Sequence, residues 1–374
     1  GGGDPKITLE RFWLWLRELR ARGIERIDGD VILDQSLFSR SADNFVDDEP
    51  LRAYKAEPRA LLVNFNAFRV RLVPDAGNTV IVDMFPSLKE IAVDNRLRSS
   101  AAPCVAWRDS LNYGIETQAG TRVLKLEGGF PVSCGARELQ LELIDAEAYI
   151  GALFQSLWRE LGGVLKGRVR VAETPPAATL IASFHSEPLA LAIRDINKYS
   201  NNVMARQLLL TLAARAQRPA TRAIGVQAIE TWLKANGLLA PGLIIENGSG
   251  LSRNERISAR GLGKLLEHGW RSRYAPEFVS SLPIAGFDGT LQNRLKSADG
   301  AAYARLKTGS LDNVRSIAGY VIDRANVVWV VVAIVNDPRA DQAEIVFQAL
   351  LAHLRSHAST RPVPRRLKPE LVPE

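Results

Sequence analysis

The spacing of hydrophobic residues predicts a first half that is rich in strands and framed by helices. Leu9, Phe12 and Leu16 recur at helical intervals, which predicts a helix over residues 8–22. From about residue 61 to 146, short alternating runs separated by Gly, Pro, Asn and Asp predict a series of short strands. The other predicted elements of this half are a strand over 27–34, a helix over 146–161, a strand over 164–172 and a strand over 180–184.

The second half changes to helices that are followed by strands. Helices are predicted over 189–196, 203–214, 224–236 and 343–352, and strands over 304–311, 316–322 and 327–335. The connections between these strands are short and rich in Asp and Asn, which favours an antiparallel meander. Helices packed on an antiparallel sheet are typical of an α+β domain, so we expect that class here, with a boundary near residue 180.

Composition fits a folded protein of two or three domains. The chain has 374 residues, of which 46% are hydrophobic and 24% charged, and this excludes a largely disordered or collagen-like protein. The longest uninterrupted apolar run covers 327–335, far short of the ~20 residues that a spanning helix needs, so no transmembrane segment is expected. Residues 358–374 hold four prolines among basic residues and are predicted to form a disordered tail.

The charge distribution and the positions of the histidines and cysteines exclude some classes of function. The chain carries 48 Lys and Arg against 41 Asp and Glu, and this net charge of +7 is spread along the sequence. Such a distribution suits an anionic polymer but lacks the clustered patch of a nucleic-acid-binding protein. The four histidines show no ligand spacing, so neither a metal nor a cofactor is expected. Spacing alone leaves Cys104 and Cys134 as either free thiols or one disulfide.

Three polar motifs of the second half are candidates for chemistry. They are Lys198-Tyr199-Ser200-Asn201-Asn202, Glu246-Asn247-Gly248-Ser249-Gly250-Leu251-Ser252 and Lys307-Thr308-Gly309-Ser310. Each alone is more often a loop with a helix cap, a turn or a strand with a bulge. However, a Ser-x-Asn that precedes a Lys-Thr-Gly by about a hundred residues follows the order used by β-lactamases and penicillin-binding proteins.

With these motifs the sequence resembles the class C, low-molecular-mass penicillin-binding proteins, which are D-alanyl-D-alanine carboxypeptidases and endopeptidases of the serine peptidase type. The resemblance covers nearly the whole chain. Besides the three motifs, its landmarks are Gly2-Gly3-Asp4-Pro5, Ile27-Asp28-Gly29-Asp30-Val31 with Asp34, Leu282-Pro283-Ile284-Ala285-Gly286, Asp288-Gly289-Thr290 and Leu311. The implied fold is an α+β penicillin-recognising domain, with helices packed on an antiparallel sheet and a β-rich inserted region.

The resemblance implies three catalytic residues. Ser200 would relay protons between the nucleophile and Lys307, and Lys307 would supply positive charge and share in proton transfer. Asn202 would hydrogen-bond the peptide carbonyl of the substrate. Acyl transfer needs an activated hydroxyl group and fixed donors where the oxyanion forms, and these residue types can supply both.

Substrate binding is implied for the rest of the Lys-Thr-Gly-Ser motif. The hydroxyl groups of Thr308 and Ser310 would bind the carboxylate of the terminal D-alanine, and the Ser310 backbone N–H would form half of the oxyanion hole. Gly309 has no side chain, so the substrate could approach the backbone at this point. The implied partners are therefore peptidoglycan stem peptides, with β-lactam antibiotics as covalent inhibitors.

The Ser-x-x-Lys motif that carries the nucleophile of this family does not occur in the chain. The nearest match, Thr231-Trp232-Leu233-Lys234, has Thr in place of Ser and follows Ser200, which is the wrong order. In the family the nucleophile precedes the Gly-Gly-Asp-Pro region, where this chain begins, so we expect the nucleophile upstream of it. As given, the chain is expected to lack the acylating serine.

The family's large insertion also accounts for the first half. Residues 1–182 are predicted to be inserted and non-catalytic, perhaps as two nested modules, and 183–357 to be the C-terminal part of the catalytic domain. Export to the periplasm is implied, and an exported protein favours a disulfide between Cys104 and Cys134.

Two other functions compete with a serine peptidase. The absence of Ser-x-x-Lys and the charge of +7 would also suit an inactive peptidoglycan-binding or scaffolding relative. A β-lactamase is less favoured, because the large insert and the Gly-Gly-Asp-Pro region point to the peptidase.

Overall fold

The computed structural model describes residues 1–40, 51–75, 77–296 and 302–356, and the described residues divide into two units. The N-terminal unit comprises Gly1–Glu187, Asn202–Ala228 and Asn247–Ser249, and the C-terminal unit comprises Pro188–Asn201, Ile229–Glu246 and the described part of Gly250–Glu374. The tail predicted over 358–374 lies outside the described residues. The inserted region predicted over 1–182 stays a prediction.

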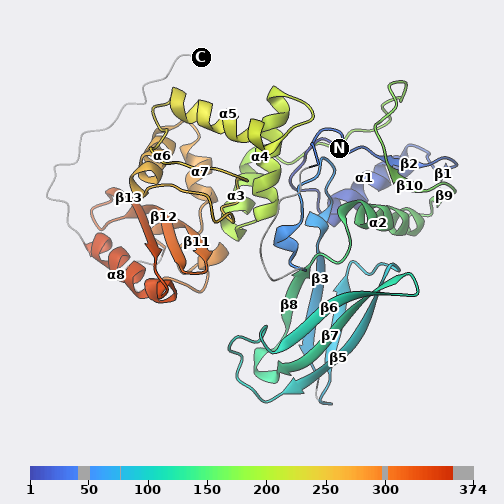
Figure 1. Ribbon diagram of the computed structural model, residues 1–374, viewed down its shortest axis with the longest axis horizontal. Coiled ribbons are helices and arrows are strands. Elements are labelled where there is room, and N and C mark those ends of the chain that lie inside the picture. The colour runs from blue at the N-terminus through green and yellow to red at the C-terminus, as the bar shows by residue number, and fades with distance from the viewer. Residues whose placement is uncertain (41–50, 76, 297–301, 357–374) are drawn as a thin grey trace. The chain divides into compact units, whose positions relative to one another are not determined.

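Two helices and two pairs of short parallel strands, contributed by residues before and after the strand-rich segment, form one part of the N-terminal unit (Figure 1). Helix α1 (Leu9–Ala21) is capped by Thr8, whose hydroxyl accepts from the Arg11 N–H, and α2 (Ala146–Glu160) by Asp145. The predicted strands over 27–34 and 164–172 are each broken into two short ones. They are β1 (Arg26–Ile27) paired with β9 (Val164–Leu165), and β2 (Val31–Leu33) paired with β10 (Val169–Val171).

The strand-rich segment forms two three-stranded sheets. The first is antiparallel in the order β4 (Val80–Phe85), β3 (Phe68–Pro74), β8 (Arg137–Leu141). The second has β7 (Thr121–Pro131) between β5 (Ile91–Ser100), which is parallel to it, and β6 (Leu111–Gln118), which is antiparallel. Within residues 61–146 the alternating runs predict strands over 68–73, 79–84, 121–126 and 138–144, so β5 and β6 were missed, because their polar residues mask a clean alternation.

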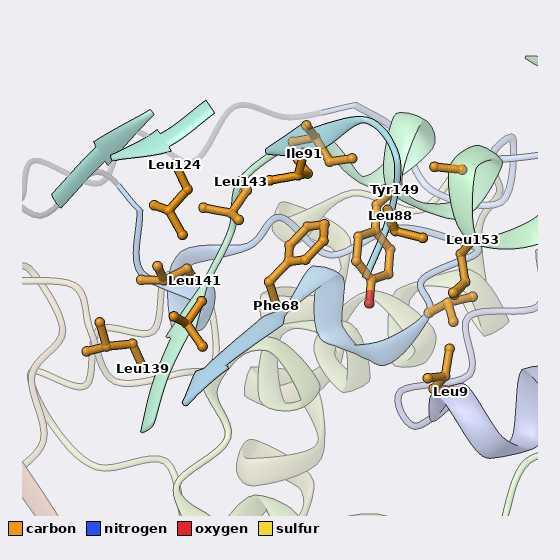
Figure 2. Packing of buried hydrophobic residues seen from close by; sticks show 14 of the residues in the cluster. Leu9, Phe68, Leu88, Ile91, Leu124, Leu139, Leu141, Leu143, Tyr149 and Leu153 are labelled. Carbon is orange, nitrogen blue, oxygen red and sulfur yellow. The ribbon is translucent and has the colours of Figure 1, made fainter. Parts of the chain in front are cut away.

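One hydrophobic cluster joins these sheets to the helices (Figure 2). Phe68 of β3 and Tyr149 of α2 are fully buried and meet edge to face, with ring centroids 5.0 Å apart. Burying aromatic rings in this geometry stabilises the fold beyond the buried area alone. The Tyr149 hydroxyl accepts from the Asn64 side chain and donates to the Ala67 carbonyl, so its polar end is satisfied.

The disulfide implied by the family is present. Cys104 and Cys134 are bonded, and their Cα atoms are 4.9 Å apart. The bond links the segment before β6 to the short 3-10 turn after β7, and Cys134 is buried in the main cluster. Closing a loop of this size restricts the unfolded chain and so favours the folded state.

The strand predicted over residues 180–184 is wrong. These residues form no ladder. Instead, Arg22, which caps the C-terminus of α1, donates to the Ile181 carbonyl, and Arg11 of α1 donates to the carbonyl of His185, just after the segment. The Arg11 guanidinium also lies over the Phe184 ring, with 4.7 Å to its centroid. Side chains thus replace the neighbouring strand that the alternating pattern would require.

The C-terminal unit packs helices on the predicted meander, which confirms the α+β class. The sheet runs in the order β11 (Ala304–Leu311), β12 (Val314–Ile322), β13 (Val328–Asn336), with both pairings antiparallel. Figure 1 shows α8 (Ala343–Ser356, red) beside this sheet, and Phe347 and Leu351 of α8 join the sheet's buried cluster.

The other helices of this unit are α3 (Leu189–Tyr199), α6 (Ala259–Arg271) and α7 (Ala275–Ser281), whereas α4 (Asn202–Ala216) lies in the N-terminal unit. α5 (Arg222–Ala235) follows α4 in the chain. In the part of the chain that the structure describes, no helix combines the length and the apolar character that crossing a membrane requires.

Candidate active site

The site is built from the end of a helix, the first strand of the meander and a loop. Ser200 caps the C-terminus of α3 in the left-handed region, with φ +55° and ψ +45°. This conformation is unfavourable for a residue with a side chain and is found at helix ends and at functional sites. The Ser200 N–H donates to the Ile196 carbonyl, which secures the turn.

Lys307 of β11 meets Ser200 here. Its Nζ donates to the Ser200 Oγ at 2.9 Å and to the Thr308 carbonyl at 2.9 Å. Burial favours the neutral amine and lowers the pKa of Lys307 to about 8. A lysine in this state can both accept and return a proton near neutral pH, which is what a proton-transfer group requires.

The predicted substrate-binding residues follow on the same strand. Thr308 is partly buried, and its Oγ1 lies 3.1 Å from the Oγ1 of Thr290. Ser310 is exposed, so its hydroxyl group is accessible to solvent. Gly309 pairs with Ser316 of β12, and a Cβ at Gly309 would collide with the Ser316 hydroxyl. A side chain at this position would therefore force the Ser316 hydroxyl group into another rotamer.

Asn202 is the first residue of α4 and belongs to the N-terminal unit. Of the three predicted catalytic residues, the structure thus brings Ser200 and Lys307 into contact. The assignment of Asn202 rests on its motif and stays a prediction.

Three residues without a sequence-derived role complete the site. Lys198 is only 4% exposed, and its Nζ donates to the Asp288 carboxylate at 2.6 Å and to the Leu282 carbonyl at 2.7 Å. Asp288 begins the Asp-Gly-Thr segment that carries Thr290. These residues belong to motifs on which the family resemblance rests. However, nothing in the spacing of the sequence indicates that the buried lysine contacts the aspartate of the loop.

The Asn-Gly-Ser-Gly motif is a turn in the structure. The Asn247 Oδ1 accepts from both the backbone N–H and the hydroxyl group of Ser249, at 2.9 and 2.7 Å. Gly248 has φ +79°, which a residue with a side chain rarely adopts. Glu246 precedes this turn and accepts from Ser252 and Asn254, so the loop is stabilised by its own polar groups.

Over the described ranges, no three His, Cys, Asp or Glu side chains come together in a group that could hold an ion.

Comparison with known proteins decides the family. The family model described as "D-Ala-D-Ala carboxypeptidase 3 (S13) family" matches residues 1–354. The chain belongs to this S13 family. The fold and the motif-based resemblance are thereby confirmed, and the S13 match includes Ser200, Lys307 and the loop that carries Thr290.

Two curated relatives agree with the S13 assignment. The chain is 28% identical to the D-alanyl-D-alanine carboxypeptidase DacB of Haemophilus influenzae over 85% of this chain and 67% of that protein. It is 27% identical to the D-alanyl-D-alanine carboxypeptidase of Actinomadura sp. (strain R39) over 86% of this chain and 62% of that protein. It therefore spans about two thirds of the length of these relatives.

The crystal structure of penicillin binding protein 4 from Haemophilus influenzae has the same fold, with a TM-score of 0.74 over 94% of this chain and 81% of that chain, at 23% identity. A second structure of that protein, in complex with a novel β-lactam, matches with a TM-score of 0.69. The structural similarity therefore includes both units of the chain.

Proposed function

We propose that the protein is a serine-type D-alanyl-D-alanine carboxypeptidase, with endopeptidase activity on the same bond type, that acts on peptidoglycan stem peptides. The contact of 2.9 Å between the Lys307 Nζ and the Ser200 Oγ carries this proposal, because it pairs an amine of lowered pKa with a hydroxyl group. Such pairs move protons to and from a reacting nucleophile.

In the proposed reaction a serine hydroxyl attacks the carbonyl carbon of the penultimate D-alanine. An ester bond forms, the peptide C–N bond breaks, and the terminal D-alanine leaves with the proton of the serine on its amine. Water then hydrolyses the ester and restores the serine. With a pKa of about 8, roughly a tenth of Lys307 is neutral at pH 7, so the Ser200–Lys307 pair can accept the proton and deliver it.

We propose that the nucleophile lies outside the 374 residues, because no serine among them has lysine three positions later. Thr308 and Ser310 are the proposed ligands of the substrate carboxylate, and Asn202 the proposed donor to its peptide carbonyl. A β-lactam, which carries a carboxylate and a reactive amide, would enter the same site and acylate the same serine.

We also propose that the protein acts in the periplasm. The Cys104–Cys134 bond supports this, because structural disulfides persist in oxidising compartments and are rare in the cytosol. Peptidoglycan is located in that compartment as well.

Intact-mass measurement of the full-length protein with benzylpenicillin tests the proposal. We expect one adduct per chain, release of D-alanine from an acetylated peptide ending in D-Ala-D-Ala, and cleavage of a cross-linked stem dimer. Lys307→Met should suppress adduct formation, whereas the control Lys89→Met, at a lysine that is two-thirds exposed in the N-terminal unit, should not. Absence of both the adduct and turnover in the full-length protein would favour the inactive peptidoglycan-binding relative.

A further inference from the structure

The hydroxyl pair formed by Thr290 and Thr308 limits how Thr308 can bind an anion. Their Oγ1 atoms lie 3.1 Å apart, a hydrogen-bond distance in which either oxygen can donate. A hydroxyl group has a single proton. If Thr308 donates to Thr290, no proton is left for a substrate carboxylate; if Thr290 donates to Thr308, the Thr308 proton is free to point at the substrate.

A bound carboxylate would select the second arrangement. It accepts hydrogen bonds and cannot donate, so the Thr308 O–H turns toward it while the Thr308 oxygen accepts from Thr290. Hydrogen bonds in such a chain polarise one another, and a bond to a charged acceptor is stronger than one between neutral groups. Thr290 thereby acts on the substrate through Thr308 without touching it.

An ion pair between the buried Lys198 and the partly exposed Asp288 holds the segment that carries Thr290. Asp288 accepts from Lys198 at 2.6 Å with one carboxylate oxygen and from the Ile284 N–H at 2.7 Å with the other. Lys198 also donates to the Leu282 carbonyl, so its ammonium group joins two points of the loop over residues 282–291. Removal of Asp288 would leave the buried ammonium group of Lys198 without its carboxylate partner, which is unfavourable.

The same loop is fixed to both elements that carry the catalytic pair. Gly289 has φ +55° and lies so close to the Lys198 carbonyl that a Cβ would collide with it, which seats the loop on the last turn of α3. On the other side, the Leu306 N–H donates to the Pro283 carbonyl at 2.8 Å and joins the loop to β11. One loop therefore connects the helix that ends at Ser200 with the strand that holds Lys307.

We propose that Thr290 is a positioning residue that directs the Thr308 proton toward the carboxylate of the substrate, and that the Lys198–Asp288 pair holds Thr290 in the required place. The inference rests on the proposed function, because it assigns Thr308 to the substrate carboxylate. It adds a determinant of substrate recognition in a loop that precedes the Lys-Thr-Gly-Ser motif.

The first experiment compares Thr290→Val, which has the same shape without the hydroxyl group, with Thr290→Ser, which keeps it. The substrate for each full-length variant is an acetylated peptide ending in D-Ala-D-Ala. The C-terminal amide of the same peptide, which lacks the carboxylate, is added as a competing ligand. We expect Thr290→Val to raise KM for the carboxylate peptide about tenfold with little change in kcat, and to leave the inhibition constant of the amide unchanged. Thr290→Ser should restore the wild-type KM.

The matched control is Thr117→Val, at an exposed threonine of β6 in the N-terminal unit. A general loss of structure would weaken the binding of the carboxylate peptide and of the amide alike, and Thr290→Ser would not restore it. If Thr290→Val lost affinity equally for both ligands, or kept the wild-type KM, the inference would be overturned while the proposed function stands. A wild-type protein without turnover would instead refute the proposed function.

The second experiment does not depend on turnover. Amide hydrogen exchange is measured in the wild type, in Asp288→Asn and in the charge-neutral double variant Lys198→Met with Asp288→Asn. We expect Asp288→Asn to speed exchange at least tenfold in the last turn of α3 and at Leu306 of β11, with less effect in the double variant because no charge is left unpaired. Unchanged exchange at either place would show that the ion pair does not hold the loop and would overturn that part of the inference.

Discussion

The Lys307 Nζ and the Ser200 Oγ are 2.9 Å apart, although 107 positions separate the two residues in the chain. Lys307 is held by the edge strand of the meander, and Ser200 by the left-handed end of α3. Their contact therefore depends on the tertiary fold that brings the end of α3 to β11. The Lys307 amine is buried there, and this burial lowers the pKa of Lys307 to about 8.

Lys307→Met should change how stability depends on pH. Because the folded-state pKa is about 8 and the ordinary value 10.5, the folded state binds fewer protons than the unfolded state between these values, and this lysine adds stability as pH rises. The wild type should therefore gain thermal stability relative to Lys307→Met as the pH rises from 7 to 10. Thermal scans across that range measure the difference between the two melting temperatures, and a difference that stays constant would contradict the lowered pKa.

Ser200→Ala and Ser200→Gly should separate the role of the hydroxyl group from that of the backbone. Both variants remove the Oγ that accepts from Lys307, so both should slow penicillin acylation of the full-length protein by about 100-fold or more. Glycine tolerates φ +55° better than alanine, so Ser200→Gly should be about 1 kcal/mol more stable than Ser200→Ala. Urea unfolding provides the comparison; equal stabilities would argue against strain at this residue.

Removal of the disulfide should weaken the N-terminal unit. The bond between Cys104 and Cys134 spans 30 positions, so the double variant with serine at both should lose about 2–4 kcal/mol of unfolding free energy. The same loss should appear when the wild type is unfolded in reductant. Denaturant titrations with and without reductant test this, and the variant itself, which has no bond to reduce, should not respond to reductant.

Phe68→Ala should be among the most destabilising single substitutions in the N-terminal unit. The ring is fully buried against Tyr149, and its removal leaves a cavity that costs about 3–5 kcal/mol (Figure 2). Phe68→Leu should cost less because it fills part of that space. The exposed Gln140→Ala on β8 serves as control, with a change within about 0.5 kcal/mol. Chemical denaturation followed by tryptophan fluorescence measures all three.

Local patterns predicted the elements whose burial is regular. The three strands of the meander lie within a few residues of their predicted ranges, because alternation and short Asp- and Asn-containing turns are local signals. Helix α6 was missed because its three glycines lower helix propensity, yet Ser258 caps it by accepting from the Gly261 N–H. That cap, with Leu262 and Leu266 four positions apart, was the available signal.

The sequence by itself determined the family and the α+β class, and it predicted Ser200, Lys307 and Thr308 as site residues, because short motifs and their order are written along the chain. Only the tertiary structure decided that Lys198 pairs with Asp288, that Thr290 meets Thr308, and that the pKa of Lys307 falls. These properties arise from burial and from contacts between segments far apart in sequence, and desolvation acts on a side chain only once the surrounding elements have packed around it.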